Sequence, residues 1–467
     1  MADRDVLLVT YHFPPLGGSG VQRALKLARY LPDNGWRVHV LTAGHTHYPL
    51  IDTTLGGDSV CGEDCELSRE NVTIHRVLGY EPGGIAATAC RWMRRGTAVQ
   101  AGTEAPSLEN RLFWRLESWY AQLRLPEVEV LWAPAAIRAA RRIIKAHDIR
   151  VVVTTSPPHS IQRVGLALQQ RAGVRWIADL RDPIMDNFGY APASPKVDRY
   201  WRRLERSTVT TASKLIVTCP DLIERLQRRY PDVPRSRYLT VTNGYDLADA
   251  PCGIAPTSQS AGRFVLGYVG SFYGKQTIAP LLTAMRRLVS RRPDVAGRIE
   301  LRVVGSISAQ QRECLNDTDD VFLRLTGYRP HAESVREMAE ADCLFLMTPI
   351  NDGGRYCIPA KTFEYLAFGK HIIGLVHEDT ATGDILAEAG NVTLVRHGDS
   401  LRLMQAIENR FEAWLAGRPN GARNRDVVER YRRDRVARQY ADVLDACVTD
   451  ASEIDPVVET AAAWEAA

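Results

Sequence analysis

The sequence lacks any long hydrophobic run. No apolar stretch reaches the roughly 18 residues that a membrane-spanning helix needs. The apolar segment near the amino terminus, MADRDVLLVTYHF, is too short and too soon interrupted for a signal peptide. Neither sign of charge dominates, because 59 Lys and Arg residues balance 55 Asp and Glu residues to a formal net charge of +4. The composition therefore predicts a cytoplasmic protein and does not imply binding to nucleic acid.

Cysteine is sparse and scattered. The nine cysteines are odd in number, and Cys61 and Cys65 form the only close pair in the sequence. A zinc site at this pair would need two more ligands at suitable spacing, and the nearest candidate, His75, stands alone. We therefore expect reduced thiols, as is usual in the cytosol, and no bound metal.

Two familiar phosphate-binding motifs are missing as well. The glycines of residues 17–20 do not fit G-x-G-x-x-G, and no acidic residue is placed to bind a ribose after the second strand. Around Lys275, the segment GYVGSFYGKQ has Val269 where a Walker loop needs glycine, and Gln276 where it needs Ser or Thr. These absences argue against a dinucleotide-dependent enzyme and against phosphoryl transfer.

The sequence does contain a repeated alternation of strand and helix. Residues 5–10 form an apolar run of strand length, a Pro/Gly loop follows, and apolar spacing after it predicts a helix that ends near Gly35. The same pattern predicts further strands at 36–42, 150–155, 174–179, 214–218, 238–242, 264–269, 299–304, 321–325, 343–347, 371–376 and 392–395. The expected class is α/β, with two doubly wound parallel sheets.

The chain divides at a stretch of small, polar, Pro- and Gly-rich residues, 249–263, which is typical of a hinge between domains. We expect a first domain over 1–250, a second over 264–425, a terminal helix over 426–449 and a disordered tail over 450–467. In doubly wound sheets, ligands bind at the carboxyl ends of the strands. Two such domains facing each other predict a substrate cleft between them.

An aromatic segment between these regions has two interpretations. Residues 111–132 carry five large aromatic side chains among arginines: Phe113, Trp114, Trp119, Tyr120 and Trp132. They could form a helix that packs into the core. They could also form an amphipathic patch that touches a lipid surface or an apolar acceptor, which predicts peripheral contact with the inner face of a membrane.

Polar residues and glycines follow several strands of the first half. Gly17 and Gly18 lie between the first strand and a helix, where backbone N–H groups can approach an anion, although a tight turn without a ligand explains them equally well. His159, in SPPHS, and Asp182, in ADLRDP, also follow predicted strands. A lone histidine is more often structural, but two polar residues at strand ends suggest the acceptor side of the cleft.

The second half has two candidate phosphate-binding segments. Ser271 and Lys275 lie between a strand and a helix, where an ammonium group could meet a diphosphate. In PAKTFE, the proline suits a first helical turn, and the N–H groups of Lys361 and Thr362 could receive phosphate. Glu364 lies one turn further, where its carboxylate could accept two sugar hydroxyls or could instead be a paired structural acid.

Together, these segments resemble glycosyltransferase family 4, the retaining nucleotide-sugar transferases with the two-domain GT-B fold of Rossmann-like domains. The resemblance covers nearly the whole chain. It rests on VTYHFPPLGGSGVQRALKLARYL, TTSPPHS, DLRDP, TNGYD, GYVGSFYGKQ and IPAKTFEYLAFGK, in that order. It also implies that the segment over 426–444 is the terminal helix that crosses back to the first domain.

The resemblance implies roles for these residues. The donor is a nucleotide-diphosphate sugar, with its phosphates at Lys275, its phosphate or sugar at Thr362, and its ribose hydroxyls at Glu364. His159 would lie near the transferred sugar, and Gly17 and Gly18 would let the loop approach that sugar and the acceptor. His159, Lys275 and Glu364 are thus the expected catalytic residues.

Two positions depart from the family pattern. Tyr356 stands where an upstream glutamate is often found, with seven residues between it and the ribose-binding one, and Ser271 stands where an arginine often follows the Val-Gly pair. Arg329 or Arg355 could supply the missing positive charge. The remaining expected donor-binding residues are Gly17, Gly18, Lys275, Lys361, Thr362 and Glu364.

The resemblance implies metal-independent transfer without a cofactor, to a hydroxyl or amine of a glycan, a lipid-linked sugar or a natural product. The donor phosphate itself can take the acceptor proton, so no protein base is required. Two other functions stay open. A nucleotide-sugar epimerase would convert the donor with no acceptor present, and a non-catalytic nucleotide-sugar-binding partner protein would bind the donor without turnover, as Tyr356 and Ser271 suggest.

Overall fold

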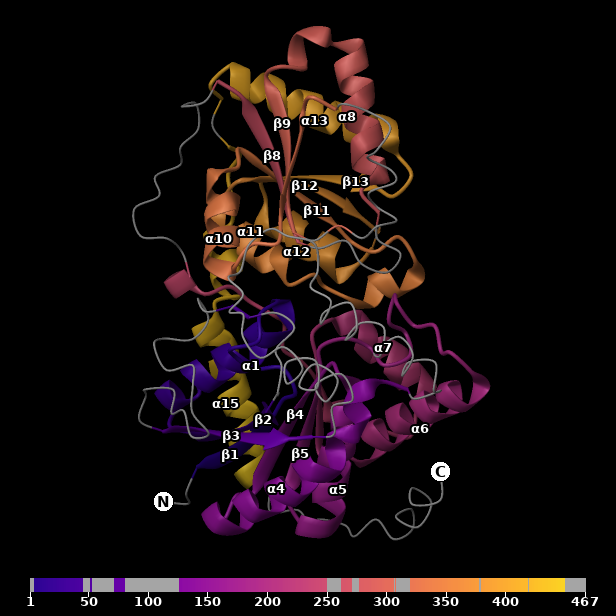
Figure 1. Ribbon diagram of the computed structural model, residues 1–467, viewed down its shortest axis with the longest axis vertical. Coiled ribbons are helices and arrows are strands. Elements are labelled where there is room, and N and C mark those ends of the chain that lie inside the picture. Colours follow the sequence, from indigo (N-terminus) through magenta and orange to yellow (C-terminus); the bar gives the residue numbers. More distant parts are fainter. Residues whose placement is uncertain are drawn as a thin grey trace, which may run out of the picture.

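Two parallel β-sheets, each covered by helices, form two domains that lie one above the other in Figure 1. The computed structural model describes residues 4–44, 51–52, 71–79, 126–249, 262–270, 277–305, 307, 320–377, 379–418 and 420–449. All strand pairs in both sheets are parallel. The predicted α/β class with two doubly wound domains is confirmed.

The first sheet has seven strands in the order β3-β2-β1-β4-β5-β6-β7. Its strands are β1 (Asp5–Val9), β2 (Arg37–Gly44), β3 (Val72–Leu78), β4 (Val151–Ser156), β5 (Arg175–Leu180), β6 (Lys214–Val217) and β7 (Tyr238–Thr240). Its described helices are α1 (Ser19–Tyr30), α4 (Ala133–His147), α5 (Gln162–Ala172), α6 (Pro195–Thr211) and α7 (Pro220–Arg229). The strand order reverses at β1, which pairs with both β2 and β4, so a ligand site is expected beyond the end of β1.

The second sheet has six strands in the order β10-β9-β8-β11-β12-β13. Its strands are β8 (Phe264–Val269), β9 (Ile299–Val304), β10 (Leu323–Gly327), β11 (Cys343–Met347), β12 (His371–Val376) and β13 (Val392–Arg396). Its described helices are α8 (Ala279–Arg291), α10 (His331–Glu340), α11 (Lys361–Phe368), α12 (Ala381–Ala389), α13 (Ser400–Leu415) and α14 (Arg425–Glu429). The order reverses at β8, which makes the end of that strand the matching position for a ligand.

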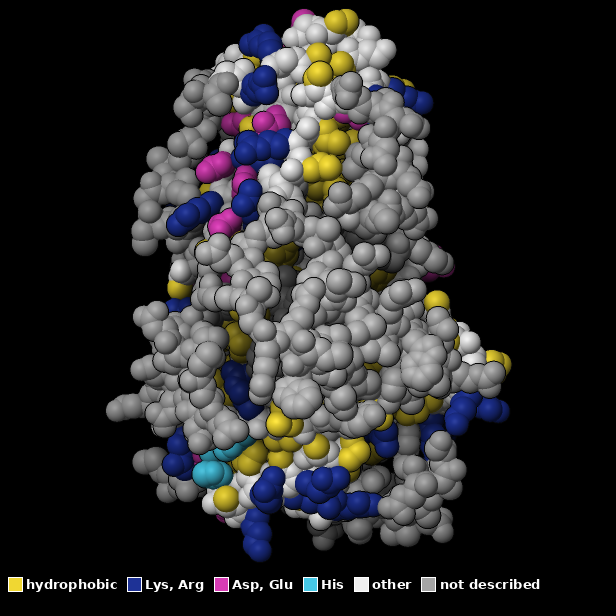
Figure 2. All heavy atoms as spheres, viewed as in Figure 1, with side chains coloured by type: hydrophobic (Ala, Val, Ile, Leu, Met, Phe, Trp, Pro, Cys, Tyr) yellow, Lys and Arg dark blue, Asp and Glu magenta, His cyan; other side chains and the backbone are white. Residues whose placement is uncertain are grey.

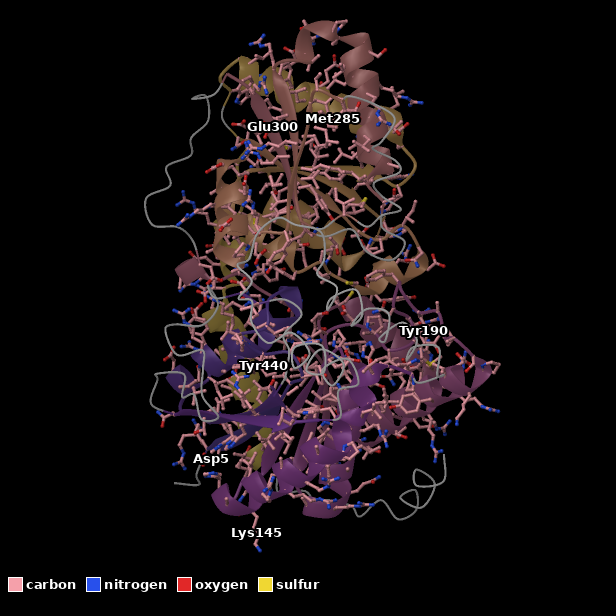
Figure 3. All side chains as sticks on the ribbon, viewed as in Figure 1. Asp5, Lys145, Tyr190, Met285, Glu300 and Tyr440 are labelled. Atoms are coloured by element: carbon pink, nitrogen blue, oxygen red, sulfur yellow. The ribbon has the colours of Figure 1, made fainter. Side chains whose placement is uncertain are left out.

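The last helix, α15 (Arg433–Thr449), returns to the first domain, where Figure 1 shows it beside α1. Seven of its side chains join the apolar core beneath α1: Val436, Ala437, Tyr440, Ala441, Val443, Leu444 and Cys447. Tyr440, labelled in Figure 3, also accepts a hydrogen bond from Arg23 at 3.0 Å. The chain therefore passes between the domains twice. The exact domain limits that the sequence suggests stay a prediction.

The domains contact each other directly beside the cleft. The side chain of Asn351 donates to the Phe188 carbonyl at 2.7 Å, and the Ala381 N–H donates to Asp221 at 3.2 Å. A Cβ on Gly353 would lie 2.4 Å from the Phe188 nitrogen, so this backbone approach requires glycine. One apolar cluster contains side chains of both domains, which fixes their relative position.

Strand β3 is absent from the strands expected from the sequence. Val72 and Ile74 are buried while Thr73 between them is exposed, so this strand shows the alternation of a half-buried edge. The alternation is confined to the first three residues of the strand and is lost after Ile74, which explains why periodicity alone did not single it out.

Part of the predicted aromatic patch belongs to the core. Trp132 is buried, and its indole N–H donates to the Val77 carbonyl at 3.0 Å. This corrects the prediction of a lipid-facing role for Trp132, because its polar and apolar parts already have partners. Phe113, Trp114, Trp119 and Tyr120 lie outside the described residues, as do Cys61, Cys65 and the predicted tail over 450–467.

The described helices are all too short or too polar to cross a bilayer. On the face shown in Figure 2, Lys and Arg side chains are spread over both domains among acidic and apolar groups rather than gathered in one patch. Among the described residues, no three His, Cys, Asp or Glu side chains are grouped closely enough to hold a metal ion.

Candidate active site

A cleft of about 1260 Å³, open to solvent, lies between the two domains. Gly18, just after β1, lines it from the first domain, and Gly270, just after β8, lines it from the second. The cleft thus lies beyond the two strands at which the sheet orders reverse. Its other described lining residues are Gln22, Asp52, Phe188, Val269, Val304, Gly305, Tyr328, Arg329, His331, Ser334, Met338, Met347, Pro349, Cys357, Pro359, Ala360, Lys361, Glu364 and Arg433.

Four helices begin at the cleft. Gly18 is the residue before α1, and His331, Lys361 and Arg433 are the first residues of α10, α11 and α15. Helix amino termini carry partial positive charge and free N–H groups, so they favour anions. At α10 and α15, the first N–H groups already donate, from His331 to the Asp52 carboxylate at 2.9 Å and from Arg433 to the Tyr245 carbonyl at 2.9 Å. The amino termini of α1 and α11 make the cleft suited to a phosphorylated ligand.

Glu364 lines the cleft with a side chain that is 25% exposed, and one oxygen lies 4.0 Å from His331 Nε2. Both interpretations of this acid therefore have support, since the carboxylate has a partner and is also open to a ligand. Its neighbours Phe363 and Tyr365 are fully buried and belong to the core.

His331 links the second domain to the first. Its Nε2 lies 3.2 Å from Asp249 Oδ2, and Asp249 also accepts from Lys26 of α1 at 2.6 Å. Burial disfavours the charged imidazole, but the hydrogen bond to Asp249 and the charge of Glu364 outweigh it and raise the pKa of His331. Sequence reasoning missed this residue because its partners are far away along the chain.

Lys361 lines the cleft close to Glu364. Burial lowers the pKa of Lys361 to about 7, against the opposing effect of Glu364, so its ammonium group is poorly stabilised without an anion. Its Nζ lies 4.0 Å from the centre of the Tyr268 ring. Gly270 has a φ of 141°, and a Cβ there would lie 2.4 Å from that nitrogen, so glycine makes room for the lysine.

Thr362 is placed differently from the prediction. Its N–H, which we expected to be free for phosphate, donates to the Pro359 carbonyl at 2.9 Å. Its side chain is fully buried, its hydroxyl has no hydrogen-bond partner among the described residues, and it is not among those that line the cleft. The tight turn that begins α11 uses this N–H, which leaves Lys361 and Glu364 as the charged residues of this segment that line the cleft.

The other second-domain candidates differ in position. Ser271 and Lys275 lie outside the described residues. Arg329 lines the cleft, but its side chain is exposed and pairs with Glu333 at 3.4 Å. Tyr356 packs against the apolar cluster at the domain boundary and is not among the described lining residues.

His159 lies in a second pocket next to the cleft. It shares this pocket with Tyr190 and Trp201, and its ring stands edge-on to Trp201 with centroids 6.0 Å apart. Asn187 and Gly189 line this pocket, whereas Phe188 between them lines the main cleft, so the two spaces are neighbours. Burial lowers the pKa of His159 to about 4, with a smaller effect of Arg181, which keeps the imidazole neutral.

Asp182 lies behind the cleft wall. It accepts from the Cys357 thiol at 3.7 Å, and Cys357 itself lines the cleft from the second domain. Burial raises the pKa of Asp182, although the neighbouring Arg181 opposes this. Gly17 precedes Gly18 but is not among the described lining residues.

Comparisons with known proteins agree with this geometry. Residues 17–244 match the family model described as a glycosyl transferase 4-like domain. No curated protein sequence matches the chain. Sucrose-phosphate synthase from Thermosynechococcus elongatus is similar in structure, with a TM-score of 0.65, 16% identity, and coverage of 95% of this chain and 99% of that one.

Two further solved structures are similar over nearly their whole length. The α,α-trehalose 6-phosphate synthase from Burkholderia multivorans has a TM-score of 0.59 and 14% identity, and the match covers 96% of this chain and 100% of that chain. Anabaena HepE in complex with UDP and glucose has a TM-score of 0.54 and 13% identity, with 94% and 99% covered. At these identities the likeness shows the shared two-domain fold.

Proposed function

We propose that this chain, whose residues 17–244 match the glycosyl transferase 4-like domain and whose two-domain fold is shared with solved glycosyltransferases, is a retaining glycosyltransferase that uses a nucleotide-diphosphate sugar. The sugar would pass to a hydroxyl or amine of a glycan, a lipid-linked sugar or a natural product. Anabaena HepE, which shares the fold, holds UDP and glucose, and this supports UDP as the first nucleotide to test.

The observation that carries this proposal is the convergence of helix amino termini with Lys361 and Glu364 on one cleft. A diphosphate leaving group needs its developing negative charge stabilised, and preoriented N–H groups and a lysine provide this without reorganisation. Glu364, whose side chain is 25% exposed, can accept the ribose hydroxyls. Lys275, from its place in the sequence, would bind the phosphates as well.

We propose that the donor phosphate takes the acceptor proton. In a retaining transfer the acceptor hydroxyl attacks on the face from which the diphosphate leaves, so a phosphate oxygen is close to that proton. His159 is neutral at neutral pH, and its pocket adjoins the cleft at Phe188, which suits a place beside the transferred sugar or the acceptor. The proposed mechanism needs no metal ion and no cofactor.

The test is thermal stabilisation by a panel of UDP-, GDP-, dTDP-, ADP- and CMP-sugars. A ligand that binds only the folded state at about 100 times its Kd stabilises the protein by about 2.7 kcal/mol. We expect one nucleotide to raise Tm, with the shift lost in Glu364→Ala and Lys275→Ala. Glu388→Ala is the matched control, because that glutamate is exposed and pairs only with Arg430 among the described residues.

The outcomes separate the alternatives. If none of these donors raises Tm, the proposed donor site is wrong. Donor binding without transfer or hydrolysis would support the non-catalytic partner protein, and conversion of the donor without an acceptor would support an epimerase. Contact with the inner face of a membrane stays a prediction, because Trp114 and Trp119 lie outside the described residues.

A further inference from the structure

Arg433 is a buried cation that faces the cleft and has no side-chain partner among the described residues. It is the first residue of α15, is 7% exposed and lines the cleft opposite residues of the second domain. Its backbone N–H donates to the Tyr245 carbonyl at 2.9 Å, which fixes its position. Within the described part of the chain, its guanidinium makes no hydrogen bond and no ion pair.

The three carboxylates whose charges act on Arg433 already have other partners. Asp246 accepts from Tyr30 at 2.7 Å and pairs with Lys26 at 2.7 Å, and Asp249 is held by Lys26 and His331. Glu364 lies 4.0 Å from the same histidine. Within the described residues, the positive charge of Arg433 is therefore left without a close anion, although a buried charge is costly unless it is paired.

A second buried arginine shows how a buried positive charge is usually compensated. Arg23, on α1, is also buried, but its guanidinium makes two hydrogen bonds to Asp179, at 2.9 and 3.0 Å, and donates to Tyr440. Burial, with a smaller effect of Arg23, lowers the pKa of Arg433 to about 10, against the opposing charges of Glu364 and Asp249. Arg433 is thus nearly as buried as Arg23, at 7% exposed against 2%, but among the described residues its guanidinium has no hydrogen bond or ion pair to compensate for that burial.

We propose that Arg433 binds a phosphate group of a substrate in the cleft. Its planar guanidinium can donate two parallel hydrogen bonds to phosphate oxygens, which suits it to this ligand better than a lysine would be. The inference rests on the proposed function, since it needs a phosphorylated substrate between the domains. That phosphate belongs either to the donor diphosphate or to a phosphorylated acceptor.

Arg433 differs in position from Arg329 and Arg355, the two arginines that the sequence suggested as replacements for the positive charge absent at Ser271. Arg329 is exposed and paired with Glu333, and Arg355 is not among the described lining residues. Arg433 comes from the crossing helix of the first domain, while Lys361 begins α11 of the second. A phosphate between them would be held from both domains at once.

The experiment titrates UDP, GDP, dTDP, ADP and the parent nucleosides into the full-length protein by calorimetry, and glucose 6-phosphate into the protein saturated with the best nucleotide. The variants are Arg433→Met, which keeps an apolar stem, and Arg433→Lys, which keeps one charge. Arg432→Met is the matched control, because the adjacent arginine pairs with Asp434 at 2.9 Å and is not among the described lining residues.

We expect Arg433→Met to weaken the binding of one phosphorylated probe by roughly 10- to 100-fold and to leave the binding of the nucleosides unchanged. Arg432→Met should leave the binding of every probe unchanged. Arg433→Lys should recover part of the loss. A loss for the nucleoside diphosphate assigns Arg433 to the donor, and a loss only for glucose 6-phosphate assigns it to an acceptor phosphate. Unchanged binding of both probes would overturn the inference.

Two controls separate this inference from other failures. A structural arginine would lower Tm when replaced, whereas removing an unpaired buried charge should leave the Tm of unliganded Arg433→Met equal or higher. If the wild-type protein binds no nucleoside diphosphate, the proposed function fails. In that case glucose 6-phosphate is titrated into the unliganded protein, and the Arg433 inference fails as well unless Arg433→Met weakens that binding.

Discussion

At the scale of single residues, two ion pairs show how strongly burial determines the contribution of a charge to stability. Arg23 and Asp179 are both buried, and Thr155 donates a further hydrogen bond to Asp179 at 2.7 Å. Arg4 and Asp445 form an ion pair of similar length, 3.2 Å, but both side chains are at least 36% exposed. Solvent screens the second pair and not the first.

We predict that Asp179→Asn lowers the free energy of unfolding by about 3–5 kcal/mol, because it leaves the Arg23 guanidinium buried without its counter-charge. Asp445→Asn, the matched control, should cost under about 1 kcal/mol. Urea denaturation followed by circular dichroism measures both. Similar losses in the two variants would contradict this explanation.

The sequence allowed some site residues to be predicted and not others. Lys361 and Glu364 follow a proline that suits a helix start, and this local signal led to residues that do line the cleft. His331 and Arg433 carry no such signal. The partners of His331 lie 82 and 279 residues away, so only the tertiary fold brings them together.

Secondary-structure elements pack closely where glycine replaces a side chain. Gly165, in α5, faces Trp176 of β5, and a Cβ at this position would lie 2.0 Å from the indole nitrogen. Trp176 is itself fully buried and donates to Thr154 at 2.7 Å, so it has no space to move. The glycine lets the helix and the strand approach each other.

Gly165→Ala should therefore destabilise the protein by about 1–3 kcal/mol through overpacking, although alanine is the better helix former by about 1 kcal/mol. Gly297→Ala provides the control, because a Cβ there meets nothing within 4 Å. Differential scanning calorimetry compares the two. A rise in Tm for Gly165→Ala would show that α5 can shift away from Trp176.

The sequence was most informative about which segments form secondary-structure elements. Long apolar runs such as Phe264–Val269 and Cys343–Met347 are buried on both faces of a parallel sheet, and this burial makes them recognisable. Val72–Leu78, at the sheet edge, has fewer buried residues and was not predicted. Periodicity reports burial, so it detects central strands better than edge strands.

At the scale of the whole molecule, His331 and Asp249 form an ion pair between the second domain and the segment that leaves the first. The pKa of His331 is raised from its ordinary value of 6.5. Burial opposes ionisation of Asp249, but hydrogen bonds to His331 and Lys26 lower its pKa to about 2. The pair is therefore fully formed below pH 6.5 and above the ordinary aspartate value of 3.8.

We predict that this stabilisation is lost as the pH rises through the raised pKa of His331, because the imidazole then releases its proton. Chemical denaturation of wild type and His331→Gln from pH 5 to pH 9 tests it. The stability difference should be largest at the acidic end and shrink toward the basic end. A difference that does not change with pH would show that His331 acts only through packing.

Helix α15 has a consequence for how the chain is made. Residues 436–447 complete the core of the first domain, yet ribosomes synthesise them after the whole second domain. Domains usually fold in the order in which they emerge. Here the surface beneath α1 stays uncovered until α15 has been synthesised. The first domain therefore reaches its final form later than the second domain. A chain released prematurely near residue 430 would keep a complete second sheet but leave that surface open to chaperones and proteases.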